Sequence, residues 1–207
     1  MSQHIPHLRI GCAAGFSGDR TDAAAPVVQA LIASGQPAVP LFETLPQRTL
    51  PLAQLPPRTH PAAGPEPPPV ALLQPVLADC LAHGVRIVSN FGAANPAGAA
   101  RRIHQLAAAL GLRAPRIAVV QGDDLSGPHH RALLERALGP AMPTEPIVSA
   151  NAYIGAQAIA DALRAGADIV VCGRVADPSL VLGPAMAHYG WAADDWDRLA
   201  RATMAGH

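Results

Sequence analysis

The sequence predicts an α/β fold: a mostly parallel sheet of about six strands with helices on both faces, a three-layer, Rossmann-like arrangement. Short apolar, β-branched runs such as residues 169–172 have the pattern of strands buried on both faces. These runs alternate with segments of helical periodicity, the order expected for parallel strands joined by crossover helices. Part of a β/α barrel is the alternative, although a closed eight-stranded barrel takes about 250 residues and this chain has 207.

The N-terminal part of the chain supplies the first two predicted strands. Apolar side chains alternate with polar or small ones over residues 7–12, and residues 38–42 form a second apolar run. Thr21 or Asp22 can cap the helix between them, because a short polar side chain accepts a hydrogen bond from the free N–H groups of a first turn. Residues 46–69 are dense in proline, which locks φ and lacks an N–H, so we expect a loop or a lid there.

The rest of the chain repeats the same unit of strand, polar loop and helix. Helical periodicity closed by a glycine predicts a helix over residues 70–83, and a β-branched run predicts the third strand over 85–89. The same reasoning predicts strands over 116–121, 147–149 and 169–172, and helices over 97–110, 129–138, 154–165 and 194–207. Pro178 suits the first turn of one more helix, with Asp177 as its cap.

Composition excludes several classes of function. The formal net charge is zero and no basic stripe is present, so nucleic acid is not an expected partner. No apolar run is long enough to span a bilayer and no signal-peptide pattern is present, so we expect a cytoplasmic protein with no membrane partner. All 15 basic residues are arginine, which excludes a pyridoxal-phosphate (PLP) lysine, a P-loop lysine and a side-chain Schiff base on this chain.

Polar side chains follow the predicted strands, at what would be the carboxyl edge of the sheet. In open α/β sheets ligands bind outside this edge, so these loops together predict a site. Its candidate residues are Ser17, Asp19, Arg20, Asn90, Asn95, Asp123, Asp124, Asn151, Tyr153, Arg174 and Asp177. Each of these side chains also has a purely local alternative, as a helix cap, a turn residue or half of an ion pair.

The candidates divide by chemistry. Arg20 and Arg174 are expected to bind a carboxylate or phosphate, because a guanidinium group holds such anions through two parallel hydrogen bonds. The side chains expected to do acid–base catalysis are Asp19, Asp123 and Asp177. If the site uses a divalent metal, its ligands would be Asp123 and Asp124. The side chains expected to contact the substrate are Ser17, Asn90, Asn95 and Asn151.

Two common kinds of site do not fit the sequence. The glycines near the first strand lack the G-x-G-x-x-G spacing of a dinucleotide site, and neither H-E-x-x-H nor C-x-x-C occurs, which argues against a zinc site. Cys12, at the end of the first predicted strand, is the only thiol near the expected edge, whereas Cys172 reads as a small core residue.

Four segments, residues 11–20, 86–96, 149–153 and 168–178, resemble in sequence and in order the acyclic terpene utilisation (AtuA-like) family. Members of that family are encoded near acyl-CoA carboxylases, in catabolism of the citronellol and geraniol type and in related branched acyl-CoA pathways. The resemblance implies a pathway rather than a particular reaction. Family members are normally much longer, so we expect residues 7–207 to be an N-terminal-type domain, truncated after His207 and lacking the family's C-terminal part.

With this resemblance, the sequence predicts an enzyme, or an enzyme's N-terminal domain, acting on an acyl-CoA or related carboxylate. A site without lysine suits hydration, isomerisation, hydrolysis or lyase chemistry better than imine chemistry. One alternative is a non-catalytic accessory protein that binds an acyl-CoA or a carboxylase, and another is a folded fragment with no function of its own. The expected partners are a small-molecule or acyl-CoA ligand, further copies of the chain in a homo-oligomer, and carboxylase pathway proteins. The cofactor is left open, a divalent metal included.

Overall fold

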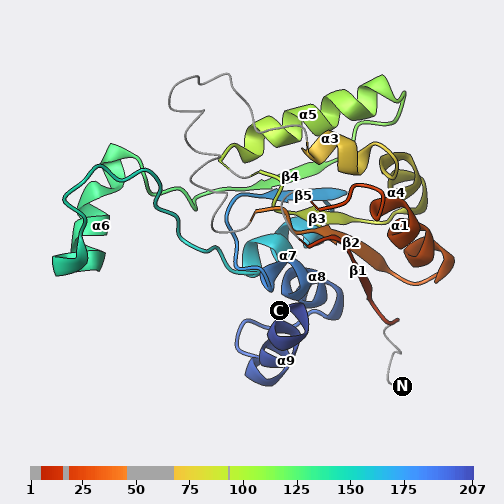
Figure 1. Ribbon diagram of the computed structural model, residues 1–207. Helices are drawn as coiled ribbons and strands as arrows, with labels where there is room; N and C mark the ends of the chain where they lie inside the picture. Colours follow the sequence, from red (N-terminus) through yellow and green to blue (C-terminus); the bar gives the residue numbers. More distant parts are fainter. Residues whose placement is uncertain (1–5, 16–18, 46–67, 93) are drawn as a thin grey trace.

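The computed structural model describes residues 6–15, 19–45, 68–92 and 94–207, and in them five strands form one sheet with helices around it (Figure 1). The strands are β1 (Arg9–Ala14), β2 (Ala38–Phe42), β3 (Ile87–Ser89), β4 (Ile117–Val120) and β5 (Ile169–Cys172). Ser17 and residues 46–67 of the proline-rich segment lie outside the described residues, so the substrate contact and the lid predicted there stay predictions. The predicted α/β fold with a mostly parallel sheet is confirmed.

The sheet has the order β1-β2-β3-β5-β4, and every neighbouring pair of strands is parallel. The last strand in the sequence, β5, therefore lies between β3 and β4. Val88 of β3 faces Leu41 of β2 on one side and Val170 of β5 on the other. All three side chains are buried, which explains why these strands read as continuous apolar runs rather than alternating ones.

The strand predicted over residues 147–149 is wrong, and the sheet has one strand fewer than expected. Val148 is 42% exposed, and no described strand pairs with these residues. Only single bridges occur nearby, between Asp124 and Asn151 and between Ile154 and Val175. A three-residue apolar run indicates β-propensity, but it does not reveal whether a neighbouring strand is available for pairing.

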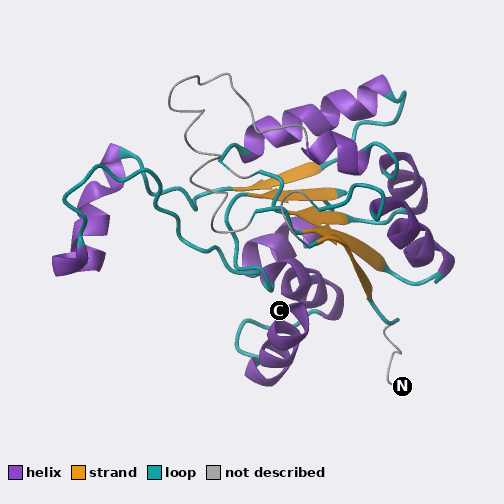
Figure 2. Cartoon of the chain, viewed as in Figure 1, coloured by secondary structure: helices purple, strands orange, loops and turns teal. Residues whose placement is uncertain are grey.

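Helices cover both faces of the sheet, as Figure 2 shows. Against one face pack α1 (Ala24–Ala33), α3 (Pro68–Leu73), α4 (Leu77–His83) and α5 (Pro96–Ala109), and against the other α7 (Gln157–Arg164) and α8 (Ser179–Tyr189). The last helix, α9 (Trp196–Gly206), packs against α8. No helix in the described part of the chain is both long and apolar enough to cross a membrane.

Three details of the helices differ from the sequence prediction. The helix predicted over residues 70–83 is two helices, α3 and α4, because the ring of Pro75 cannot continue the hydrogen-bond ladder between them. The first helix starts at Ala24 without a side-chain cap, so neither Thr21 nor Asp22 caps it. Asp177 does not cap α8 either. Its carboxylate pairs with Arg174 instead.

The connections reverse direction at one point along the carboxyl edge of the sheet. From β1, β2 and β3 the chain continues into helices on the first face, whereas from β4 and β5 it continues to α7 and α8 on the second. The neighbours β3 and β5 therefore send their loops to opposite faces. This is the topological switch point at which open α/β sheets bind ligands.

One segment projects from this edge. Residues 125–150, called the arm below, connect β4 to α7 and contain η1 (Pro128–His130), α6 (Arg131–Leu138) and η2 (Gly139–Ala141). In Figure 1 the arm extends away from the sheet, and none of its residues is buried.

Candidate functional site

Asn90 and Arg174 follow the neighbouring strands β3 and β5 at the carboxyl edge of the sheet. The two loops are joined there, because the Gly92 N–H donates to the Cys172 carbonyl at 3.0 Å. Asn90 is 0% exposed and Arg174 is 1% exposed. Burying a charged group is costly unless it is paired and hydrogen-bonded, so the partners of Arg174 define what this part of the molecule can do.

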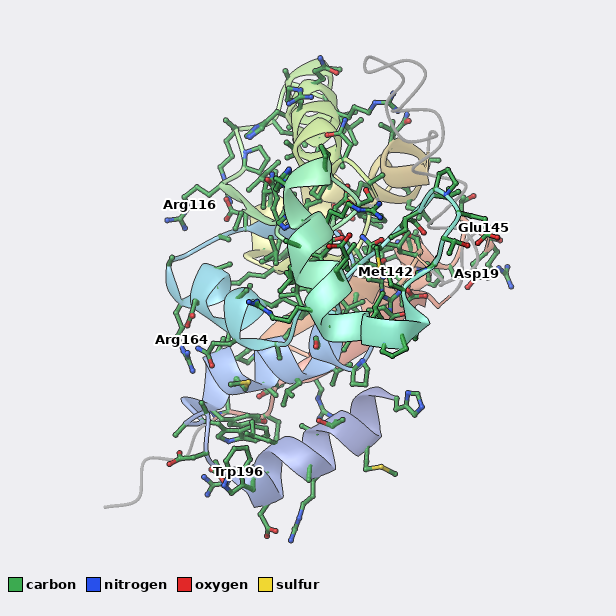
Figure 3. The ribbon with its side chains drawn as sticks, turned by 90° about the vertical axis from the view of Figure 1, so that its left-hand side faces the viewer. Asp19, Arg116, Met142, Glu145, Arg164 and Trp196 are labelled. Carbon is green, nitrogen blue, oxygen red and sulfur yellow. The ribbon has the colours of Figure 1, made fainter. Side chains whose placement is uncertain are left out.

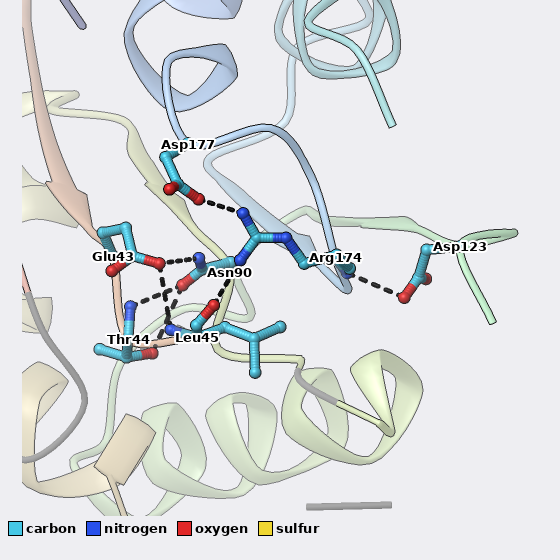
Figure 4. A network of polar contacts seen from close by, with 7 residues as sticks. All are labelled: Glu43, Thr44, Leu45, Asn90, Asp123, Arg174 and Asp177. Carbon is cyan, nitrogen blue, oxygen red and sulfur yellow. Dashed lines mark hydrogen bonds and ion pairs between the residues drawn. The ribbon is translucent and has the colours of Figure 1, made fainter. Parts of the chain in front are cut away.

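The Arg174 side chain is held by three segments of the chain, two of which, at Leu45 and Asp177, are drawn in Figure 4. One terminal nitrogen donates to the Leu45 carbonyl after β2, and the other pairs with the carboxylate of Asp177 before α8. The Tyr153 ring lies over the guanidinium, with 4.1 Å between the Arg174 Cζ and the ring centroid. The Nε–H of Arg174 finds no partner among the described residues. The guanidinium therefore fixes Asp177, whose side chain is 51% exposed, while staying buried itself.

Asn90 orients a second carboxylate, that of Glu43. Its Nδ2 donates to the Glu43 Oε1 at 2.7 Å, and its Oδ1 accepts from the Thr44 N–H at 2.7 Å. The Leu45 N–H also donates to Glu43, at 3.2 Å. A fully buried amide thus locks both the backbone after β2 and the acid that follows this strand.

Asp123 is a supporting residue in this arrangement. Its Oδ2 accepts from the Arg174 N–H at 2.9 Å and from the Asn151 side chain at 3.0 Å. Asp123 is only 4% exposed, and it occupies the space that a Cβ on Gly173 would fill. Glycine at 173 is therefore what allows this carboxylate to approach the backbone of β5.

A cavity of about 590 Å³ opens beside this network, where β1 and β2 end and α8 begins. Its apolar lining residues are Ile10, Leu41, Leu180, Val181 and Ala205. Its polar lining residues are Cys12, Glu43, Asp177 and His207. Two carboxylates, each held by a buried side chain, therefore face one partly apolar cavity. Such a pair can accept a proton from one position of a ligand and donate one to another.

Asp19 and Arg20 lie on the loop after β1, at the same edge, and their contacts are local. Asp19 accepts from the Gly15 N–H at 3.2 Å and the Arg20 N–H at 2.8 Å, and these backbone hydrogen bonds lower the pKa of its carboxyl group. Arg20 forms a bidentate pair with Asp22, with both side chains in solvent, and this pairing raises the pKa of the guanidinium. An exposed pair of this kind contributes little and can exchange for another anion.

Asn95 and Asp124 also have local roles. The Asn95 side chain accepts from the Gly98 N–H at 2.8 Å and caps α5. Asp124 accepts from the backbone and hydroxyl of Ser126, at 2.8 and 2.5 Å. Both residues line a second cavity of about 250 Å³, between the segments that follow β3 and β4. The structure thus separates Asp123 and Asp124 from the larger cavity that Asp177 lines.

The described residues show neither a metal centre nor a thiol with a lowered pKa. No three His, Cys, Asp or Glu side chains gather there closely enough to hold a metal ion. Cys12 is exposed, but burial of its sulfur and then the nearby charges of Asp19 and Glu43 raise the pKa of its thiol. Burial raises the pKa of Cys80 and of Cys172 to about 12, so both are inert core residues.

Glu43 is the site residue that the sequence reasoning missed. Glu43 directly follows the apolar run 38–42. A place just after a predicted strand is also what made Asn90 and Arg174 candidates. Because the proline-rich segment begins three residues later, the position read as the start of a long loop rather than as the end of a strand.

A comparison with known protein families shows to which family the chain belongs. Residues 8–207 match the family described as acyclic terpene utilisation family protein AtuA. The chain belongs to this family. No curated protein and no solved structure matches the chain. The resemblance of the four sequence segments to this family is therefore confirmed over nearly the whole chain. Three of those segments contain residues whose contacts are described above, namely Asn90, Asn151 and Arg174.

Proposed function

We propose that this AtuA-family chain is an enzyme, or the N-terminal part of one, that acts on a branched acyl-CoA or related carboxylate in acyclic terpene catabolism. The observation that carries the proposal is the cavity where β1 and β2 end and α8 begins, which pairs an apolar wall with the carboxylates of Glu43 and Asp177. The apolar wall would receive the hydrocarbon chain, and the two acids would act on it.

The contacts of each residue indicate the role that it would have. Arg174 is buried and engaged by Leu45 and Asp177, so it would position the Asp177 carboxylate rather than touch the ligand. Arg20, exposed on the loop next to Gly15 at the cavity, would receive the carboxylate or CoA phosphates after releasing Asp22. Asn90 would keep Glu43 aimed at the cavity.

The reaction class that suits this arrangement is addition or removal of water, or a double-bond shift. In either case one carboxylate takes a proton from water or carbon while the other carboxyl group delivers one, so no net charge is created. The protein would be tested with branched, unsaturated acyl-CoAs in D₂O, with mass spectrometry of the acyl product. A gain of one water or of solvent deuterium is expected for the native chain.

Matched variants make this test specific. Glu43→Gln and Asp177→Asn should each reduce the conversion at least about 100-fold, the usual contribution of a general acid or base. Glu135→Gln and Asp161→Asn, made at exposed acids on α6 and α7, should leave it unchanged. Conversion that survives both site substitutions would contradict the assignment.

The second candidate function is a non-catalytic acyl-CoA-binding or carboxylase-associated accessory protein. The separation of Asp123 from Asp177 favours this function. Asp123 accepts hydrogen bonds from Asn151 and from the Arg174 backbone, and it does not line the cavity that Asp177 lines. Ligand binding with no turnover in the assay above, by the native chain and both variants alike, is the result that would select this function.

A further inference from the structure

The cavity of about 590 Å³ is lined by acids as well as by apolar side chains. Glu43 and Asp177 contribute their carboxylates, and no arginine is among the described residues that line it. The loop after β1, which carries Asp19, runs beside the cavity. The exposed side chains of Arg116 and Arg164 lie on the other side of the molecule from Asp19 (Figure 3), too far away to offset these acids.

Among the described residues, a cation balances only one of the two acids in the cavity. Asp177 pairs with the buried guanidinium of Arg174. Glu43 is instead held by neutral groups, an amide side chain and a backbone N–H. Arg20, on the loop after β1, is engaged in solvent by Asp22. A net negative charge therefore remains at the cavity.

Cys12 lines the same cavity and responds to this charge. The pKa of its thiol is raised, first by burial and then by the nearby charges of Asp19 and Glu43, against a smaller lowering by the hydrogen bond to the Ala14 carbonyl. Negative surroundings raise a thiol pKa because they disfavour a further negative charge, that of the thiolate. The same surroundings disfavour a carboxylate or a phosphate of a ligand at this position.

Each acid of the cavity also keeps one oxygen for a ligand. The hydrogen bonds to Glu43 end on Oε1 and the one to Asp177 ends on Oδ1, and no described residue donates to Glu43 Oε2 or to Asp177 Oδ2. An ionised carboxylate only accepts hydrogen bonds, so these two oxygens need a donor. A hydroxyl group supplies one without adding a charge, and a site built to bind a hydroxyl rejects the analogue that lacks it.

We propose that the cavity admits the neutral end of the ligand, a hydroxyl group on a branched hydrocarbon, while the anionic end, a carboxylate or a CoA phosphate, stays outside. This inference rests on the proposed function, and it adds the orientation of the ligand and the polar group that the two acids recognise. It agrees with water addition, in which one carbon of a double bond takes the hydrogen of water and the other takes the hydroxyl, so that the product is an alcohol. It also agrees with the position of Arg20, which does not line the cavity and is free to receive the anionic end in solvent.

Labelling of Cys12 in the full chain tests the charge of the cavity. The probes are two methanethiosulfonates of similar size, one with a trimethylammonium group and one with a sulfonate group, used at low salt and about pH 8, where most imidazoles are neutral. The ratio of the two rates is independent of the thiolate fraction of Cys12, and dividing it by the ratio for β-mercaptoethanol removes the difference in reagent reactivity. In the native chain the cationic reagent should be favoured at least about tenfold.

Matched variants assign this preference to the cavity. Glu43→Gln keeps the oxygen that accepts from Asn90 and removes the charge, so it should lower the preference at least about threefold. Glu135→Gln, at an exposed acid on α6, should leave it unchanged. A native preference no larger than that of β-mercaptoethanol, or a preference that Glu43→Gln leaves intact, would overturn the proposal.

Protection of Cys12 from a small neutral reagent, methyl methanethiosulfonate, tests which end of a ligand enters the cavity. Isoamyl alcohol and isovalerate share one branched carbon skeleton, so they differ only in the charge and hydrogen bonding of the terminal group. The alcohol should slow the labelling of the native chain, and isovalerate should protect at least about tenfold less well. Stronger protection by isoamylamine than by the alcohol would show that the cavity selects a cation, and it would overturn the proposal.

The outcomes separate this inference from the proposed function. Equal protection by isoamyl alcohol and isovalerate would overturn this inference alone, because the cavity would still bind a branched chain, as the proposed function requires. Absence of protection by all three ligands would contradict the proposed function as well.

Discussion

Replacing Arg174 by methionine tests how the buried guanidinium contributes to the fold. Methionine keeps much of the apolar stem and removes every hydrogen bond of the head group. The Leu45 carbonyl would then lose its donor, and leaving a buried acceptor unsatisfied costs about 1–3 kcal/mol. Loss of the contact with the half-exposed Tyr153 ring costs a further 0.5–1 kcal/mol, roughly.

Two effects work in the opposite direction. Asp177 is 51% exposed, so water can replace its lost partner at a cost of at most about 1 kcal/mol. The substitution also removes a buried charge whose Nε–H has no partner among the described residues, which regains about 1–3 kcal/mol. The expected net loss is therefore about 1–2 kcal/mol, less than the 3–5 kcal/mol, roughly, that breaking a fully buried ion pair costs.

Urea unfolding of the native chain and the variant measures this difference, provided that the slope m is unchanged. Arg164→Met is the matched control, since Arg164 also donates to a carbonyl, that of Met186, and pairs with Asp161, but is 37% exposed. It should cost less than about 1 kcal/mol. A loss above about 3 kcal/mol for Arg174→Met would refute the reasoning, because it would mean that Asp177 is not rehydrated. A gain in stability would also refute it, because removal of the buried charge would then outweigh the loss of all the contacts of the guanidinium.

Three further predictions follow from contacts elsewhere in the chain. Gly92→Ala should destabilise by about 2–3 kcal/mol, because the added Cβ would lie 2.5 Å from the Cys172 carbonyl. Gly155→Ala, with open space around it, should be neutral or stabilising in the same urea assay. Asp168 pairs with Arg113, and this hydrogen-bonded ion pair is the main reason why the pKa of the Asp168 carboxyl group is lowered from 3.8 to about 2. Asp168→Asn should therefore lower stability by about 1 kcal/mol at neutral pH, and the difference should disappear as pH falls from about 4 to 2, since a depressed folded pKa stabilises only above it. Cys12 alone should react with a thiol reagent in the native chain, faster as pH rises, and an occupied cavity should slow that reaction; equal labelling of all three cysteines would be inconsistent with the fold.

The sequence was sufficient for the fold class because burial leaves a strong local mark. The runs at residues 38–42 and 169–172 are strands covered on both faces, so their composition alone predicts them. Residues 147–149 have the same composition but lie in the arm, where no described strand pairs with them. Pairing is a property of the tertiary structure, and a short run of residues does not encode it.

The clustering of the candidate residues was predicted in outline, while their contacts were not. Asn90, Asp123, Asn151, Arg174 and Asp177 are brought together because parallel strands end at one edge. Which of them would face a ligand depends on hydrogen bonds that link residues far apart in the sequence.

Glu43 is a residue that joins the candidate site although its sequence context did not predict it. It gains its place in the site through Asn90, 47 positions later in the chain. Asp123, in contrast, is drawn away from the larger cavity by the backbone of Arg174. Neither outcome leaves a signal within a short sequence window.

The proposed function requires that a ligand of this protein occupies the cavity lined by Glu43 and Asp177. Hydrogen exchange of the native chain, with and without a branched acyl-CoA, tests it most directly. With the ligand bound, exchange should be slower at residues 43–45 and 177–181, next to the cavity. It should not change at the opposite edge of the sheet, where Pro37, Gly84 and Arg164 line a separate cavity. Protection confined to that opposite edge, or no protection with ligand in excess, would contradict it.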